Sequence, residues 1–107
     1  MLARRAVAQR PNEANYHDTL GFILTRMKKL TEARDEITRS VELSAPDSIM
    51  RARALFSLAR LAQALNETGP IAKYLDEALA IDARQGVFTA QERKEVQALR
   101  AGGAGTP

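Results

Sequence analysis

The chain has 107 residues, a length that suits a single domain with a modest core. It contains no cysteine, which excludes a disulfide framework and a thiolate metal site, and no apolar run approaches the length of about 18 residues that a membrane-spanning helix needs. The formal net charge is +3, and the basic excess lies in Arg4, Arg5 and Arg10, so the dense basic stripe typical of nucleic-acid binding is missing.

The first half of the sequence predicts three helices that are separated by short turns. One spans residues 2–9. The next begins after an N-cap at Asn12 and ends near Met27, and the third begins with Thr31 as its N-cap and ends near Leu43. Apolar residues recur in the second and third helices at the three-four spacing of one helix face, namely Tyr16, Leu20, Ile23, Leu24, Met27, Leu30, Ala33, Ile37 and Val41.

The second half first predicts two longer helices. Pro46 fits the first turn of the fourth helix, which runs to about Leu65, because the missing N–H of proline costs nothing there. Pro70 opens the fifth helix, which ends near Ala83 before Gly86 breaks the chain. The apolar faces of these helices contain Leu55, Leu58, Ala59, Ala62 and Leu65, and then Ile71, Leu75, Ala78, Leu79 and Ile81.

Residues 89–92 form a capping box, Thr-Ala-Gln-Glu, that begins a last helix. In such a box the hydroxyl of Thr89 accepts the amide N–H of Glu92, and the carboxylate of Glu92 accepts the amide N–H of Thr89. This helix is expected to end near Leu99 with Val96 and Leu99 facing inward, and residues 101–107 are expected to form a flexible tail. Short links make neighbouring helices antiparallel, so the predicted fold class is all-α.

Two parts of the chain repeat with a spacing of 38 residues. Residues Leu20, Gly21, Leu24, Ala33, Ile37, Ser40 and Leu43 precede Leu58, Ala59, Ala62, Ile71, Leu75, Ala78 and Ile81 by this spacing. Lys28 and Asn66 share one turn position, and asparagine tolerates the left-handed conformation that ends helices. Ala3, Ala6 and Pro11 lie 34 residues before Ile37, Ser40 and Ala45. The extra residues of the longer spacing fall near residues 44–48 and amount to about one helical turn, which predicts that the fourth helix begins a turn early.

A helix–turn–helix period of 34 residues with this arrangement resembles the tetratricopeptide repeat. The residues that carry the resemblance are Leu20-Gly21, Leu24, Ala33 and Ile37. The family implies antiparallel helical hairpins stacked as a right-handed solenoid with a C-terminal capping helix. Within a domain of residues 1–100, it assigns a partial repeat to residues 2–11, full repeats to residues 12–45 and 46–85, and the capping helix to residues 88–100. His17 departs from the family pattern, which often has tryptophan there.

The partial repeat leaves the apolar side of residues 2–9 uncovered. Exposed apolar faces seldom stay exposed, so we expect this segment to self-associate or to pack on an upstream repeat. The same segment is Arg-rich and free of acids, like the start of a transit peptide, but it is short and lacks serine. The repeat register explains it better.

In this family the first helix of each hairpin lines a concave groove that takes a peptide, so the resemblance implies a protein-interaction scaffold. Carried over by register, the groove residues would be Asn15, Asp18, Phe22 and Arg26 from the second helix and Arg53, Phe56, Arg60 and Gln63 from the fourth. Two guanidiniums beside an aromatic ring suit a partner with acidic or carboxylate groups. The alternative is that these residues are ordinary solvated surface. Asp18 and Phe22 replace the residues with which chaperone adaptors of the family clamp a C-terminal carboxylate, so that activity is not expected.

No catalytic, cofactor or metal site is predicted. His17 is the only histidine, no cysteine accompanies it, and no nucleophile lies beside a base. The predicted partner is therefore another protein or peptide, with no nucleic acid and no membrane span. The alternative function is a structural or accessory subunit of a larger assembly that uses several faces. The compartment stays open, and the absence of cysteine is compatible with the reducing cytoplasm.

Overall fold

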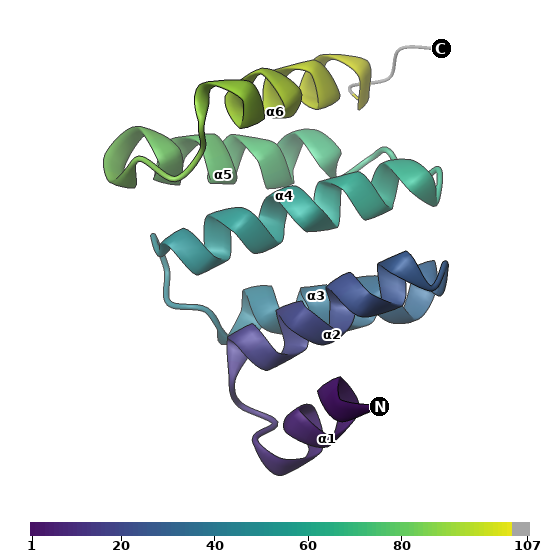
Figure 1. Cartoon of the computed structure of the whole chain (residues 1–107). Coiled ribbons are helices and arrows are strands. Elements are labelled where there is room, and N and C mark those ends of the chain that lie inside the picture. Colours follow the sequence, from purple (N-terminus) through teal and green to yellow (C-terminus); the bar gives the residue numbers. More distant parts are fainter. Residues whose placement is uncertain (104–107) are drawn as a thin grey trace.

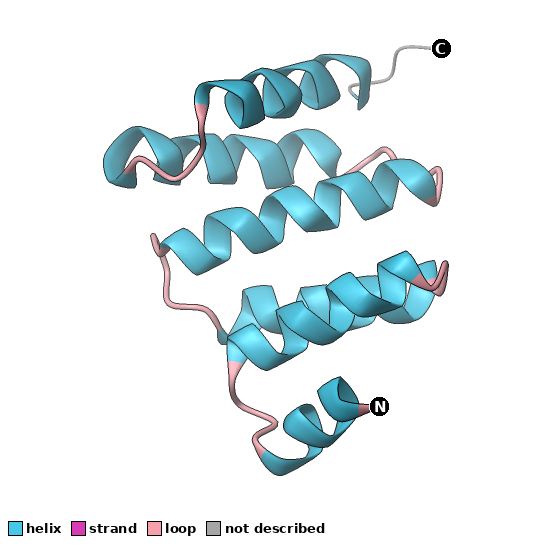
Figure 2. Cartoon of the chain, viewed as in Figure 1, coloured by secondary structure: helices cyan, strands magenta, loops and turns pink. Residues whose placement is uncertain are grey.

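The computed structural model describes residues 1–103, which form six α-helices and no strand (Figure 2). The helices are α1 (Leu2–Gln9), α2 (Ala14–Arg26), α3 (Leu30–Leu43), α4 (Ile49–Ala64), α5 (Ile71–Gln85) and α6 (Ala90–Gly103). All six helices that the sequence predicts are present, and the all-α fold class is confirmed.

The helices are arranged as two stacked hairpins, α2–α3 and α4–α5, with α1 packed on the first and α6 on the second (Figure 1). Consecutive helices contact each other along the whole chain, and α4 also contacts α2 and α6. The first helices of the two hairpins therefore lie side by side with α6 in one layer, and α3 and α5 lie behind them in the view of Figure 1. This stacking produces the predicted solenoid.

The two hairpins have the same turn geometry at positions related by the 38-residue spacing. Lys28 and Asn66 both have a φ of 62°, in the left-handed region. The amide of the next residue then reaches back over the last turn of the helix, from Lys29 to the carbonyl of Leu24 at 2.9 Å and from Glu67 to the carbonyl of Ala62 at 2.8 Å. Such bonds satisfy carbonyls that a helix end otherwise leaves open. The repeat read from the sequence is thus present in the backbone.

The core runs through both hairpins and centres on α4. The equivalent residues Leu20 and Leu58 are 2% and 3% exposed, so both hairpins close on the same interior. Because α4 is surrounded by α2, α3, α5 and α6, it is buried on more sides than the predicted stripe. The additional buried residues are Ala52, Ala54, Phe56 and Leu61.

Two predicted N-caps are wrong. The N-cap of α2 is Glu13 rather than Asn12, and the N-cap of α3 is Lys29, which leaves Thr31 inside the helix. Neither Glu13 nor Lys29 makes a side-chain capping bond. Tight turns and packing fix these helix starts, so the local preference for a capping side chain does not decide them.

The fourth helix begins about one turn early in the repeat register, as predicted, because α4 starts at Ile49 whereas the residue equivalent to Ala14, the first residue of α2, is Ala52. The expected place of Pro46 in its first turn is wrong. Pro46 lies in the link before α4, and Ser48 is the N-cap, with its hydroxyl accepting the amide N–H of Arg51 at 3.1 Å. The link contains Asp47 with a φ of 63°, and the Asp47 carboxylate pairs with Arg84 at the end of α5. Most of the extra residues therefore lengthen the helix, since α4 has 16 residues and α2 has 13.

The two ends of the solenoid are finished differently. At the C-terminal end α6 continues to Gly103, past the expected end near Leu99, so the first residues of the expected tail are helical; the rest of that tail, 104–107, lies outside the described residues. At the N-terminal end, Ala3 is the buried residue of α1, whereas Met1 and Leu2 are 50% and 78% exposed.

Within residues 1–103, no helix has both the length and the apolar character that crossing a bilayer requires.

Candidate binding groove

A pocket of about 470 Å³ lies between α2 and α4, the first helices of the two hairpins. We call it the α2–α4 groove. Its lining residues are Asp18, Thr19, Phe22, Thr25, Lys28, Leu30, Ile37, Ser57, Arg60, Leu61 and Ala64. Phe22 is 61% exposed although it is a large aromatic residue, and the facing side chains on α4 include the small residues Ser57 and Ala64. The groove therefore offers an aromatic surface opposite space that small residues leave open.

A second pocket of about 360 Å³ lies between α4 and α6. It is lined by Phe56, Arg60, Gln63, Glu95, Ala98 and Leu99. Arg60 lines both pockets, so its side chain forms the ridge between them.

The structure distributes the eight predicted groove residues over three places. Asp18, Phe22 and Arg60 line the α2–α4 groove, and Phe56, Arg60 and Gln63 line the second pocket. Asn15, Arg26 and Arg53 line neither pocket. The guanidinium of Arg26 lies 5.9 Å from the centre of the Phe22 ring, on the same helix.

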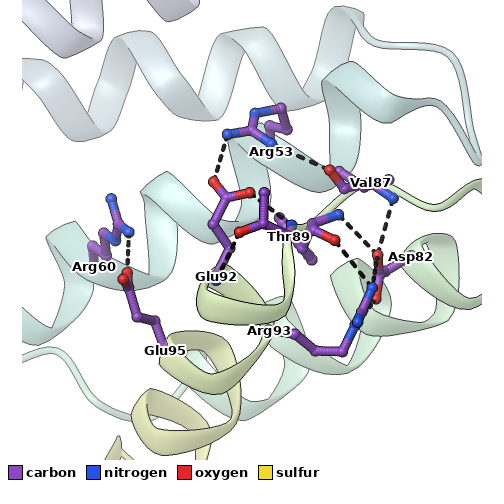
Figure 3. A network of polar contacts seen from close by, with 9 residues as sticks. Arg53, Arg60, Asp82, Val87, Thr89, Glu92, Arg93 and Glu95 are labelled. Carbon is purple, nitrogen blue, oxygen red and sulfur yellow. Dashed lines mark hydrogen bonds and ion pairs between the residues drawn. The ribbon is translucent and has the colours of Figure 1, made fainter.

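The arginines predicted to receive an acidic partner already have carboxylate partners on α6 (Figure 3). Arg53 pairs with Glu92 and Arg60 pairs with Glu95, each at 2.8 Å, and Arg53 also donates to the carbonyl of Val87 at 3.4 Å. These are exposed pairs and contribute little stability, but they neutralise the two guanidiniums within the chain.

Phe56 is buried beneath this polar layer. It is 4% exposed, its ring meets that of Phe88 edge-on with 5.5 Å between centroids, and the guanidinium of Arg60 lies 3.9 Å from its centre. The aromatic ring between the two arginines thus serves to dock the segment that leads into α6.

Asp18 is a half-buried carboxylate that lacks a direct partner. Within residues 1–103, no hydrogen bond or ion pair reaches its oxygens. Burial raises the pKa of Asp18, and the positive charge of Arg53 acts in the opposite direction. Since Arg53 is bonded to Glu92, the charge of Asp18 is only weakly compensated.

Asp82, which was not singled out in the sequence, holds α6 in place (Figure 3). Its buried carboxylate accepts the amide N–H groups of Val87 and Phe88, both at 2.9 Å, and the Nε–H of Arg93 at 2.7 Å. The hydrogen bond from Arg93 and those from the two amides lower the pKa of Asp82 to about 2. An acidic residue at a helix C-terminus opposes the helix dipole, and this misplacement is the sequence signal that points to such a role.

The capping box at residues 89–92 is confirmed (Figure 3). The Thr89 amide donates to the Glu92 carboxylate at 3.0 Å, and the Glu92 amide donates to the Thr89 hydroxyl at 3.1 Å. Val96 is fully buried and Leu99 is 9% exposed, so both face inward as predicted. The second carboxylate oxygen of Glu92 remains available for Arg53.

His17 is buried in the first hairpin and bonded at both ring nitrogens. Its Nδ1 lies 2.8 Å from the carboxylate of Glu36 and its Nε2 lies 2.6 Å from the carbonyl of Pro11. It thus ties the link before α2 to α3. In the part of the chain that the structure describes, no group of three or more metal-ligating side chains is close enough together to hold an ion.

Comparison with known proteins gives a family and a fold. A family model described as tetratricopeptide repeat matches residues 5–84. The structure is similar to a solved one titled "TPR2B-domain:pHsp70-complex of yeast Sti1", with a TM-score of 0.79 and 18% sequence identity over 95% of this chain and 77% of that chain. At this identity the likeness concerns the fold alone. No curated protein matches the sequence significantly.

Proposed function

Because the chain belongs to the tetratricopeptide repeat family, we propose that it is a protein-interaction module that binds a partner segment in the α2–α4 groove. Stacked repeats of this kind create extended binding surfaces from the helices of one layer. Here that layer consists of α2, α4 and α6. The groove lies between its first two members.

The observation that carries the proposal is the exposure of Phe22 inside the groove. A side chain of this size is usually buried, and Phe22 is 61% exposed in a pocket that also contains Leu30, Ile37 and Leu61. Exposed aromatic residues in a concave setting are the typical anchors of protein interfaces. The volume of about 470 Å³ is within the range of ligand pockets.

We do not propose the acidic partner that the sequence suggested. That expectation rested on Arg53 and Arg60, whose guanidiniums are paired with Glu92 and Glu95. A ligand carboxylate would have to displace these pairs, and the exchange of one carboxylate for another gives little net free energy.

Selection of peptides tests the proposal. We expect a random-peptide phage library to yield ligands for the wild-type chain, and the affinity of those ligands to fall about tenfold or more in Phe22→Ala, as for a typical interface anchor. Ser57→Tyr should weaken the same ligands because it fills the groove from the α4 side.

The matched control is Ile49→Ala, which removes an apolar side chain that is 50% exposed and lies outside the groove lining. Its affinity for the selected peptides should equal that of the wild type. Equal losses in all three variants, or unchanged binding by Phe22→Ala and Ser57→Tyr, would refute binding in the groove.

A second candidate role is association of two copies of the chain through α1, which the exposed apolar residues at its start favour. Met1 and Leu2 are 50% and 78% exposed next to one another, and an apolar surface of this kind suits contact with a second copy of the chain. Sedimentation velocity tests this role: the wild type should associate with rising concentration, and Leu2→Lys should not. A wild type that stays monomeric over the same range would argue against it.

A further inference from the structure

The charges in the α2–α4 groove leave one carboxylate without a direct partner. Three charged residues line the groove, namely Asp18, Lys28 and Arg60. Arg60 is neutralised by Glu95, and Lys28 is an exposed lysine at the turn after α2. Asp18 lies ten positions before Lys28, which is roughly 15 Å at the rise of a helix. Because this distance exceeds the screening length of physiological salt, about 8 Å, Lys28 does little for Asp18.

The position of Asp18 makes its negative charge unfavourable while no partner occupies the groove. Its carboxylate is half-buried, and among the described residues it has neither a hydrogen bond nor an ion pair. Burial disfavours the charged form, as the raised pKa of Asp18 shows. Arg53, whose positive charge acts on Asp18, is bonded to Glu92 and to the carbonyl of Val87. A cationic donor from a ligand would relieve this cost.

Spacing then sets the pattern of the ligand. Asp18 and Phe22 are four residues apart on α2, so their Cβ atoms are about 5–6 Å apart on one helix face. In an extended peptide, side chains two positions apart point the same way and are separated by about 6.6 Å. A basic and an apolar side chain with one residue between them can therefore reach Asp18 and Phe22 together.

Resting on the proposed function, we propose that the α2–α4 groove selects an extended protein segment in which a lysine or arginine stands two positions from an apolar residue. The basic side chain pairs with Asp18, and the apolar side chain packs on Phe22 between α2 and α4. This preference is opposite in charge to the acidic partner that Arg53 and Arg60 suggest from the sequence, because α6 supplies acids to both arginines.

The experiment compares the peptides selected by the wild type with those selected by Asp18→Asn. The wild-type chain should enrich sequences with a basic residue two positions from an apolar one. Asp18→Asn should keep the apolar residue and lose the basic one. For one selected peptide, replacement of its basic residue by glutamine should weaken binding to the wild type about tenfold, or about 1.4 kcal/mol, and should change binding to Asp18→Asn less than twofold.

Two further variants separate the charge from the fold. Asp18→Glu retains the carboxylate and should retain the preference for a basic residue. Asp35→Asn makes the same chemical change on the exposed surface of α3, outside the groove lining, and should select the same peptides as the wild type. Circular dichroism of all variants checks that they fold.

Each outcome decides between the two proposals. Apolar peptides without a charge preference, or with an acidic one, would overturn this inference and leave groove binding intact. The failure of the wild type to enrich any peptide would overturn both. Basic peptides that bind Asp18→Asn as well as they bind the wild type would assign the preference to another carboxylate and also overturn the role of Asp18.

Discussion

Gly21 and Ile37 face each other across the α2–α3 hairpin so closely that no side chain fits at position 21. A Cβ atom on Gly21 would lie 2.4 Å from Cγ1 of Ile37 and 3.3 Å from the carbonyl oxygen of Ala33. The second hairpin has Ala59 and Leu75 at the two equivalent positions, and both are buried. Leucine is not branched at Cβ, so the α4–α5 hairpin holds a methyl group where the first hairpin has no space for one.

The substitution Gly21→Ala should therefore destabilise the chain. Overpacking in a tight core costs about 1–3 kcal/mol, whereas the better helix propensity of alanine returns at most about 1 kcal/mol. We expect the free energy of unfolding to fall by about 1–2 kcal/mol, measured by urea denaturation followed by circular dichroism.

A double variant provides the control for this prediction. Gly21→Ala combined with Ile37→Leu copies the pair Ala59 and Leu75 of the second hairpin and should recover most of the lost stability. The interpretation fails if Gly21→Ala alone is as stable as the wild type, or if the double variant is less stable than either single one.

Ser40 is another position at which the two hairpins differ. Its hydroxyl is fully buried and has no hydrogen-bond partner among the described residues, and the equivalent residue in α5 is Ala78. A buried polar group without a partner costs about 1–3 kcal/mol. We expect Ser40→Ala to raise the free energy of unfolding by about 1 kcal/mol in the same denaturation experiment.

Ser44 is a matched control for this prediction, since it lies one helical turn after Ser40, at the end of α3. It is also buried, but its hydroxyl donates to the carbonyl of Ser40 at 2.7 Å. Ser44→Ala should therefore be neutral or destabilising. Equal effects of the two substitutions on the free energy of unfolding would show that the missing hydrogen-bond partner of Ser40 does not destabilise the chain.

The hairpins were predictable because their determinants are local in the sequence. Lys28 and Asn66 occupy equivalent left-handed positions, and Thr89 and Glu92 satisfy each other within four residues. The spacing from Leu20 to Leu58 is enough to place both residues in the core. Such features need no knowledge of which helices meet.

The features that the sequence did not reveal depend on the docking of α6. The sequence of α4 alone predicts an open face with Phe56 between Arg53 and Arg60. In the structure Phe88 covers Phe56, and the carboxylates of Glu92 and Glu95 neutralise the two arginines. Helix periodicity describes one buried stripe, and α4 is contacted by helices on several sides. The reversal of the expected ligand charge follows from the same cause.

Asp82 predicts a pH dependence of stability. Its pKa in the folded chain is about 2, below the ordinary value of 3.8, because of the hydrogen bonds from Arg93 and from the amides of Phe88 and Val87. A carboxylate with a lowered pKa stabilises the fold above its unfolded pKa, and this contribution is lost as the pH falls through the folded value. Thermal unfolding should therefore show a loss of stability between about pH 4 and pH 2.

The variants Asp82→Asn and Asp76→Asn assign this loss. Asp82→Asn should be less stable than the wild type at neutral pH by about 1.5–3 kcal/mol, the value of hydrogen bonds to charged groups, and most of this difference should be lost at about pH 2. Asp76 pairs with Arg100 on the exposed surface, so Asp76→Asn should have little effect at any pH. If Asp82→Asn is less stable than the wild type by the same amount at pH 2 as at neutral pH, Asp82 acts through packing and not through its charge.

The contact between Phe56 and Phe88 predicts that α6 can be loosened without loosening the first hairpin. Phe88 is 5% exposed, and removal of such a buried ring costs about 3–5 kcal/mol. Within residues 1–103, α6 contacts only α4 and α5. Because stacked repeats depend mainly on their neighbours, the loss should be local. In Phe88→Leu, amide hydrogen exchange should accelerate most in α6 and then in α5, while the amides of α2 and α3 keep their protection. Glu95→Gln, which removes only an exposed ion pair, should leave all these rates nearly unchanged. A uniform acceleration across all helices in Phe88→Leu would mean that the solenoid unfolds as one unit, and α6 would then be part of the core and not a cap on it.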